Sequence, residues 1–244
     1  LEPRTQPYPP NAADADAAAP VRVTDGLVAL YDFEAGSGAT VDDVSGVGTP
    51  IDLTIATPAA VSWVAGALRV SGTTVITSTT STTKIVSACK LSNELTVEAW
   101  AKAANLTQSG PARIVSLSID TSNRNFTFGQ TLSEYRARLR TSTTDAQGTP
   151  EMNAGGPVTK SLQHVVLTFD ETGYMTVYVD AALKATLFRG GDFSTWASDY
   201  PLLVANEATG DRPWLGDLHL VALYCRGLSQ GEIAQNFAAG PDGT

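Results

Sequence analysis

One eight-residue stretch, Leu95–Lys102, constrains the fold more than any other part of the chain, because two kinds of side chain alternate along it. One face carries Leu95, Val97, Ala99 and Ala101, and the other carries Thr96, Glu98, Trp100 and Lys102. A period of two residues is the signature of a β-strand. The small apolar face suits packing against a second sheet, whereas the other face brings an acid and an indole to a groove or a layer of covering loops. We therefore predict the central strand of a two-layer β structure.

Length and charge limit the classes of partner. A chain of 244 residues can bury roughly 70–75% of its unfolded surface, so its core needs no metal. The formal net charge of −9 opposes electrostatic binding to phosphates or anionic lipid, so we expect no nucleic-acid partner. We also expect no membrane insertion, because no apolar run approaches the ~20 residues that span a bilayer.

The two cysteines, Cys89 and Cys225, each lie beside a predicted strand and do not form a Cys-x-x-Cys pair. A structural zinc site needs four ligands, which makes it a poor explanation for them. Two alternatives stay open: a disulfide between them, or two buried free thiols. A disulfide would close a loop of about 136 residues and contribute roughly 4–5 kcal/mol in the chain-entropy model.

The chain begins with a segment, residues 1–22, that is rich in proline, alanine and aspartate. This composition buries too little apolar surface to offset its ordering entropy, so we expect a linker or tail. If the tail is ordered, it must pack against its own domain or against a neighbouring molecule. Residues 241–244 resemble a second tail, which leaves residues 23–240 as the domain.

From Gly26 onward, short runs with β-propensity alternate with turn residues. The predicted strands are 27–33, 51–56, 61–63, 67–70, 95–102, 113–119, 125–129, 135–140, 164–169, 174–179, 183–188 and 217–224. Residues 72–83 are largely Thr and Ser, and we predict an edge strand or surface loop there. Residues 141–156 are predicted as a long loop.

One helix is predicted near the C-terminus. Ser229 and Glu232 have the spacing of a capping box, Ile233 and Phe237 share one helical face, and Gly240 ends the pattern. Many short strands with almost no helix indicate the fold class. It is all-β, a two-sheet antiparallel jelly roll or β-sandwich with one short C-terminal helix.

Six segments carry a resemblance to a known family. They are 26–38, 43–48, 95–100, 163–170, 177–180 and 222–233. In this order they resemble the laminin-G-like (concanavalin A-like) jelly-roll domains of bacterial secreted or surface proteins, over roughly residues 26–240. The resemblance implies two antiparallel sheets, one with a concave face, a secreted or cell-surface location, and glycan binding in many relatives. A shared fold does not by itself determine function.

The resemblance also implies a calcium site, because relatives often hold calcium with an Asp-x-Ser-Gly-Asn-Gly loop and an acid on the last strand. The matching residues here are Asp43, Ser45 and Gly46, with Asp217 as the last-strand acid. Such oxygen ligands suit calcium. The sequence departs from the pattern at Val47, in the Asn position, and at His219, in the aligned position of the last strand. The alternative is a glycine-rich turn in which Asp43 accepts backbone amides.

A stretch from Arg189 to Trp214 collects aromatic, amide and charged side chains. Its candidate ligand-binding residues are Trp196, Asn206, Glu207, Arg212 and Trp214. Sugar recognition combines a flat apolar ring with planar polar groups that pair with hydroxyls. The alternative is a brace folded over one end of the sandwich, with Trp214 buried and Arg212 paired with Glu207 or Asp211.

A further set of polar residues lies on or beside predicted strands: Arg124, Asn125, Gln130, Arg138, Arg140 and His164. Alternation places Arg138 and Arg140 on one face, together with Arg136. These arginines are candidates to line a concave groove and bind acidic glycans. With Tyr135 or Tyr178 as a base, the set also resembles the polar sets of jelly-roll polysaccharide lyases. The alternative is a solvated sheet face.

Motifs for catalysis are otherwise scarce. The Glu-x-Asp-x-x-Glu pattern of paired acids is absent, and no His-Glu-x-x-His motif occurs. The one Gly-x-Ser-x-Gly match, at residues 227–231, contains Ser229 of the predicted capping box, and we do not interpret it as a nucleophile elbow. We therefore predict a non-catalytic, lectin-like module that binds a polysaccharide or glycan, with calcium as a candidate cofactor. One alternative is a subunit of a surface assembly, joined to other protein subunits by its N-terminal tail. The other is a polysaccharide lyase or glycoside hydrolase.

Overall fold

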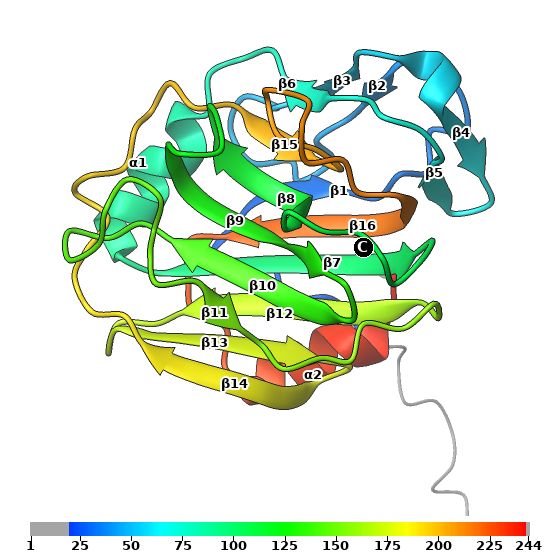
Figure 1. Ribbon diagram of the computed structural model, residues 1–244. Helices are drawn as coiled ribbons and strands as arrows, with labels where there is room; N and C mark the ends of the chain where they lie inside the picture. The colour runs from blue at the N-terminus through cyan, green and yellow to red at the C-terminus, as the bar shows by residue number, and fades with distance from the viewer. Residues whose placement is uncertain (1–19, 243–244) are drawn as a thin grey trace, which may run out of the picture.

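The computed structural model describes residues 20–242, and they form a two-layer β-sandwich (Figure 1). This confirms the predicted fold class, two antiparallel sheets packed face to face. Residues 1–19 and 243–244 lie outside the described residues, and with them lies nearly all of the predicted N-terminal tail.

The first sheet, here called sheet A, contains the predicted central strand. Its order is β14 (Ala182–Phe188), β13 (Tyr174–Val179), β12 (Gln163–Phe169), β7 (Leu95–Ala103), β16 (Gly216–Tyr224), β5 (Ala67–Val70) and β4 (Val61–Val64). β1 (Leu27–Tyr31) also pairs with β16. β7 is antiparallel to β12 on one side and to β16 on the other, as a central strand must be.

The second sheet, sheet B, faces the viewer in Figure 1. Its order is β11 (Met152–Asn153), β10 (Glu134–Leu139), β9 (Arg124–Thr131), β8 (Ala112–Ser118), β15 (Leu202–Val204), β6 (Ile76–Ser78), β3 (Leu53–Ile55) and β2 (Thr40–Val41). β6 lies between β15 and β3, so an edge strand at residues 72–83 is contradicted, whereas the residues on either side of β6, 72–75 and 79–82, are loop. The predicted long loop at 141–156 contains the two-residue strand β11.

The hydrophobic core fills the space between the two sheets. Val97 and Ala99 of β7 are fully buried in it, together with Phe126 and Phe128 of β9 and Leu117 of β8. The apolar face of β7 therefore packs as its alternation predicts. Because the apolar side chains of sheet B point into the core, the polar residues of β8 to β10 lie on its outer face.

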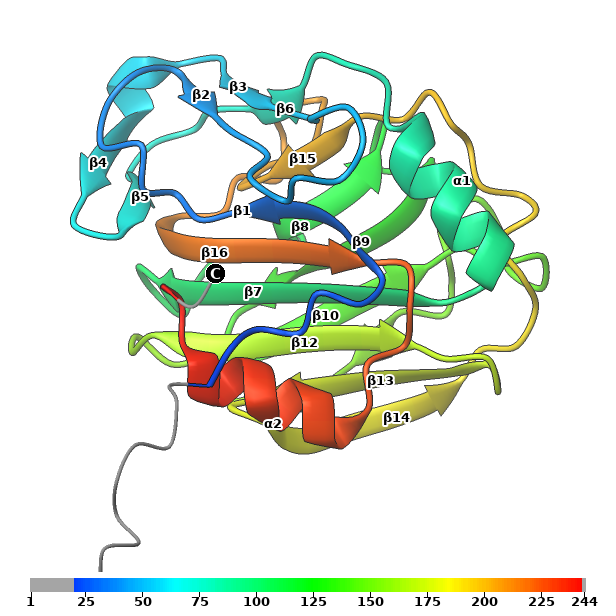
Figure 2. The ribbon, with the colours of Figure 1, turned by 180° about the vertical axis from the view of Figure 1, so that it is seen from behind.

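Helix α2 (Gln230–Ala239) covers the opposite, outer face of sheet A, as Figure 2 shows from behind. The predicted capping box at Ser229 and Glu232 is present. Ile233 is buried, and Phe237 stacks on Trp100 of β7 with ring centroids 5.6 Å apart. The second face of β7 is thus covered by a helix.

A second α-helix, α1 (Thr83–Ser92), corrects the expectation of a single helix. It buries Ile85, Val86 and Cys89 at one end of the sandwich, and a 3₁₀ turn at Pro58–Ala60 precedes β4. Within residues 20–242, neither helix has the length and apolar character needed to cross a membrane.

Cys89 of α1 and Cys225, which follows β16, form a disulfide with their Cα atoms 4.5 Å apart. The sequence left open a disulfide or two buried free thiols, and the structure contains the disulfide. Cys89 is fully buried and the bond ties α1 to the last strand of sheet A. The bridge constrains the unfolded chain across a separation of 136 residues, which is worth about 4–5 kcal/mol in the chain-entropy model.

Candidate functional site

A polar cavity of about 250 Å³ opens on the outer face of sheet B. We call it the arginine cavity. It is lined by Gly110, Pro111, Arg113, Thr121, Ser122, Arg124, Arg138, Gln147 and Arg212. Strands β8, β9 and β10 supply Arg113, Arg124 and Arg138, and the loop before β16 supplies Arg212. Four guanidinium groups from four separate segments therefore meet in one small space.

Two of these arginines, Arg113 and Arg124, are buried at about 1% exposure and form the base of the cavity. Arg113 donates from Nε to Glu207 Oε2 at 3.0 Å and from Nη1 to the Pro111 carbonyl oxygen at 2.7 Å. Glu207 is fully buried and also accepts from Ser118 Oγ at 2.5 Å. This part of the base is a complete ion pair.

Arg124 is in a different situation. It donates from Nη2 to the Thr121 carbonyl oxygen, while its Nε and Nη1 are buried and have no hydrogen-bond partner. No carboxylate within residues 20–242 forms an ion pair with it. Burial, with the neighbouring charges of Arg113 and Arg138, lowers the pKa of Arg124 to about 10, so the side chain is still charged at neutral pH.

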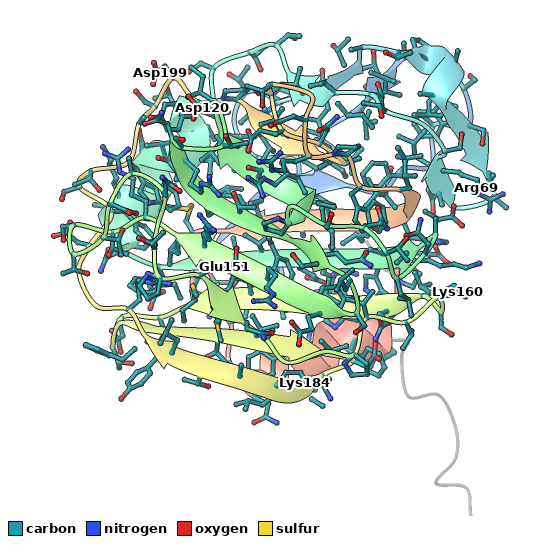
Figure 3. The ribbon with its side chains drawn as sticks, viewed as in Figure 1. Arg69, Asp120, Glu151, Lys160, Lys184 and Asp199 are labelled. Atoms are coloured by element: carbon teal, nitrogen blue, oxygen red, sulfur yellow. A yellow bond between two sulfur atoms is a disulfide. The ribbon has the colours of Figure 1, made fainter. Side chains whose placement is uncertain are left out.

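The other two arginines form the rim and are partly exposed, with 22% of the Arg138 side chain and 30% of the Arg212 side chain accessible. Arg138 donates to Glu151 Oε2 at 2.9 Å and to Gln147 Oε1 at 3.3 Å. Figure 3 places Glu151 on the face of sheet B that is turned toward the viewer. Arg212 pairs with Asp211 Oδ2 at 2.9 Å.

The loop that carries Arg212 is held by buried polar groups. Asn206 is fully buried, donates to the Thr74 carbonyl oxygen at 2.7 Å and accepts from the Arg212 backbone amide at 2.9 Å. Gly110 leaves room for the stem of Arg212, because a Cβ built there would come within 2.7 Å of Arg212 Cδ. Asn206 and Glu207 thus position the cavity wall from behind and do not reach a ligand themselves.

Chemically, the arginine cavity is a set of hydrogen-bond donors held in place by packing. Guanidinium groups donate in a fixed plane and accept nothing, so they pair with oxygen-rich groups such as sugar hydroxyls, carboxylates and sulfates. The lining holds no aromatic ring. Recognition there depends on polar pairing.

The structure corrects the expectation that two tryptophans offer ring faces to a ligand. Trp196 is 3% exposed, stacks on Phe193 with centroids 4.2 Å apart, and donates from Nε1 to the Arg140 carbonyl oxygen at 2.7 Å. Trp214 is 1% exposed and donates to Gln130 Oε1 at 2.9 Å. Both indoles are core residues whose N–H groups are satisfied, so the alternative of a brace describes them.

Of the predicted ligand-binding residues, the structure brings Arg138 and Arg212 together in the cavity, with Glu207 beneath it. Arg140 follows the end of β10 and does not line the cavity. Sequence reasoning did not single out Arg113. Its signal is a cation within the run Arg113–Ser118, which is otherwise apolar or small and fully buried.

The predicted calcium loop does not fit a calcium ion. Asp43 Oδ1 accepts from the backbone amides of Leu30 and Ser45, at 3.2 and 3.1 Å. Its Oδ2 accepts from the Ile51 amide at 3.1 Å and from Lys84 Nζ at 2.8 Å. The ammonium of Lys84 thus neutralises the carboxylate where a cation would bind.

The remaining predicted calcium ligands are also engaged elsewhere. Asp217 forms a two-pronged ion pair with Arg69, at 2.7 and 3.0 Å, and Ser45 Oγ accepts from the Val47 amide. Gly46 has a φ of 67° and serves the turn. No group of three or more His, Cys, Asp or Glu side chains within residues 20–242 is arranged to hold a metal. The turn with an amide-satisfied Asp43 is the observed arrangement.

The residues considered for catalysis are buried under α2 or in the core. Glu98 and His164 are fully buried and hydrogen-bonded at 2.9 Å, and Glu98 also pairs with Arg22 and accepts from Asn236 at 2.8 Å. Tyr135 is 2% exposed. In this conformation none of them reaches a substrate.

A larger cavity, of about 510 Å³, lies at one end of sheet A. Its charged residues are Arg69, Lys102, Lys160 and Asp217, and Figure 3 shows Arg69 and Lys160 on the same side of the molecule. Arg69 is already paired with Asp217, and both lysines are exposed. We favour the arginine cavity as the site because its donors are fixed by packing and some have no partner.

Comparisons with known proteins agree with this architecture. A family model, Laminin_G_3 of the concanavalin A-like lectin/glucanases superfamily, matches residues 72–234, which is more than half of the chain. No curated protein sequence is similar enough to match.

Solved structures resemble the fold at low identity. The sialidase of Trypanosoma rangeli in complex with sialic acid has a TM-score of 0.60 and 17% identity, over 88% of this chain and 33% of that one. The binding domain of Paraclostridial Mosquitocidal Protein 1 has a TM-score of 0.58 and 13% identity, over 88% and 52%. This chain spans about a third of the length of the sialidase.

A third structure is similar over almost its whole length. It is domain 4 of AbnA, a GH43 extracellular arabinanase from Geobacillus stearothermophilus, in complex with arabinotriose. The TM-score is 0.60 and the identity 16%, over 87% of this chain and 98% of that one. At this identity the likeness establishes the fold alone.

Proposed function

Because the chain belongs to the Laminin_G_3 family of concanavalin A-like lectin/glucanase domains, we propose that it is a non-catalytic, carbohydrate-binding module of a secreted or cell-surface protein. The arginine cavity is its contact site. The observation that carries this proposal is a recess whose fixed donors include buried N–H groups with no partner. Such groups gain most from a ligand that supplies acceptors.

Two further observations support the proposal. The arabinanase domain with the same fold was solved with arabinotriose bound, so this architecture accommodates a carbohydrate in at least one similar structure. The disulfide between Cys89 and Cys225 supports an extracellular location, because such bonds persist in oxidising compartments.

Native affinity electrophoresis tests the proposal against a panel of neutral and acidic polysaccharides. We expect at least one polysaccharide to retard the wild-type protein, and no new reducing ends to appear in the incubated glycan. Retardation should be the same with calcium and with chelator, because Lys84 neutralises Asp43. New reducing ends would replace the binding role with a hydrolytic one, and no retardation by any glycan would refute it.

A pair of variants tests the site. Arg138→Ala should weaken retardation, because Arg138 lines the cavity. Lys184→Ala is the charge-matched control, since Lys184 is an exposed residue of the edge strand β14 (Figure 3). If both variants are retarded like the wild type, the carbohydrate binds elsewhere on the domain.

A further inference from the structure

The arginine cavity carries an imbalance of charge that points to the class of its ligand. Three of its four guanidinium groups each hydrogen-bond a carboxylate: Arg113 with Glu207, Arg138 with Glu151, and Arg212 with Asp211. Arg124 has no such partner among the described residues and is about 1% exposed. The cavity therefore holds one buried positive charge in excess.

Asp120, on the turn between β8 and β9, attracts Arg124 electrostatically but forms no ion pair or hydrogen bond with it. Its carboxylate accepts from the Ser122 and Asn123 amides at 2.6 and 2.8 Å and from Asn123 Nδ2 at 3.1 and 3.0 Å. Figure 3 shows Asp120 at the upper end of sheet B. Its oxygens are committed to its own turn, and Arg124 is left with Nε and Nη1 free of partners.

We infer that the arginine cavity binds a monoanionic substituent of a sugar, a carboxylate or a sulfate ester, with Arg124 as its counter-ion. This inference rests on the proposed function and names the class of carbohydrate. A buried charge without a partner is costly, and an anion that reaches it forms charge-assisted hydrogen bonds. Arg138 and Arg212 at the rim are placed to contact the rest of the sugar ring.

The size of the cavity limits how much of a glycan can enter it. At about 250 Å³ it is smaller than the pockets that enclose drug-sized ligands, which begin near 300 Å³. It therefore takes one charged sugar unit, such as the end or a side branch of an acidic glycan. The remaining units of a polymer would lie outside it, over the face of sheet B.

Isothermal titration calorimetry of the full chain with glucuronate, glucose 6-sulfate and glucose tests the inference. We expect the two anionic sugars to bind at least tenfold more tightly than glucose. Arg124→Met should lower the affinity for the preferred anion by roughly tenfold or more. The comparison of carboxylate with sulfate ester identifies which oxyanion the cavity prefers.

The matched control is Arg136→Met. Arg136 lies on the same strand as Arg138 and pairs with Glu134 and Glu151, but it does not line the cavity. It should retain wild-type affinity. Arg138→Met provides a second cavity variant, and urea unfolding of each variant identifies any that does not fold.

The outcomes separate the two proposals. Equal affinity for glucose and glucuronate, or unchanged glucuronate binding by folded Arg124→Met, overturns the anionic site, while retardation by a neutral polysaccharide would leave the carbohydrate-binding role intact. Binding of acetate or inorganic sulfate as tight as that of the sugars also overturns it, because the cavity would then take free anions. Glucuronate binding that depends on Arg124, without retardation by any polymer, supports the anionic site and refutes polysaccharide binding.

Discussion

Two arginines of the same cavity show that the neighbours of a buried charge determine whether it stabilises or destabilises the folded protein. Arg113 and Arg124 are equally buried, and burial lowers the pKa of both. Arg113 forms an ion pair with the buried carboxylate of Glu207. For Arg124, which has no ion pair among the described residues, repulsion by Arg113 and Arg138 is stronger than the attraction of Glu207 and Glu151. The first charge is needed by the fold, and the second is a cost that the folded protein bears in the absence of a ligand.

The two arginines should therefore differ in their contribution to stability. Arg113→Met leaves Glu207 buried without its cation, which should cost about 3–5 kcal/mol of unfolding free energy. Arg124→Met removes an unpartnered charge and should change the unfolding free energy by less than about 1 kcal/mol, or raise it. Urea unfolding monitored by tryptophan fluorescence measures both. A large loss for Arg124→Met would mean that this charge already has a stabilising role in the free protein.

The pair of Asp43 and Lys84 should make stability depend on acidic pH. Burial opposes ionisation of Asp43, but the hydrogen bond from Lys84 and those from Ser45 and Ile51 outweigh it, so its pKa lies below the ordinary value of 3.8. A lowered folded pKa contributes stability above the unfolded value, and this is lost as pH falls through the folded pKa. We expect the unfolding free energy to fall with pH below about 4.

Asp43→Asn is the variant that isolates this contribution. It should be less stable than the wild type at neutral pH, and its unfolding free energy should fall less steeply with acidification. Chemical unfolding at a series of acidic pH values provides the measurement. Parallel pH profiles for the two proteins would assign the acid sensitivity to other carboxyl groups.

At the scale of elements, residues 20–23, which we call the N-terminal strap, and helix α2 together cover the outer face of sheet A. Residues 20–23 lie against α2, where the Val23 amide donates to Asn236 Oδ1 at 2.8 Å and Arg22 Nη2 donates to the Gly240 carbonyl oxygen at 2.6 Å. Arg22 also pairs with the fully buried Glu98 of β7. The fold therefore includes Arg22, one residue before the predicted domain boundary.

Loss of this arginine should weaken the strap. Arg22→Met leaves Glu98 with His164, Asn236 and Tyr224 but without a permanent cation, and we expect a loss of roughly 2–4 kcal/mol in unfolding free energy. Gln235→Ala is the control, because it removes an exposed hydrogen bond to the Val21 carbonyl oxygen and should cost under about 1 kcal/mol. Similar losses for the two variants would show that the Arg22 charge is not what holds the strap.

Elements with local signals could be predicted from the sequence, and elements made by tertiary contacts could not. β7 has its alternation, and α2 has a complete capping box. α1 lacks a side-chain cap at Thr82 and is held by the burial of Ile85, Val86 and Cys89 and by the disulfide. Its short apolar stripe follows a run of Thr and Ser residues, which favours strand or loop.

The candidate site followed the same rule. Alternation on a strand singled out Arg138, and a stretch of aromatic and polar residues singled out Arg212, but their meeting depends on the packing of β8, β9, β10 and the loop before β16. Trp196, before β15, and Trp214, before β16, are buried, contrary to the sequence expectation, because composition does not distinguish a buried ring from an exposed one. Their indole N–H groups find acceptors at Arg140 and Gln130, which the sequence could not indicate.

At the scale of the whole molecule, the arginine cavity is a local positive site on an acidic protein. The formal net charge is −9, so a polyanion approaching from a distance is repelled before it reaches the cavity. The attraction operates at short range, between the anionic group of the ligand and the donors that are buried in the face of sheet B. Salt screens the long-range repulsion, whereas it acts less on contacts inside the cavity.

The binding of an acidic polysaccharide should therefore respond to salt in the opposite sense to that of a basic protein. Between about 10 and about 150 mM salt, where the screening length falls from roughly 30 to 8 Å, we expect the association rate to rise and the dissociation rate to change little. Surface plasmon resonance on an immobilised polyuronate measures both rates. A basic polyanion-binding protein loses affinity over this range because counterions compete for its phosphate or sulfate contacts. An affinity that falls steeply with salt here would mean that the cluster of four arginines, and not the net charge, sets the field that an incoming glycan meets.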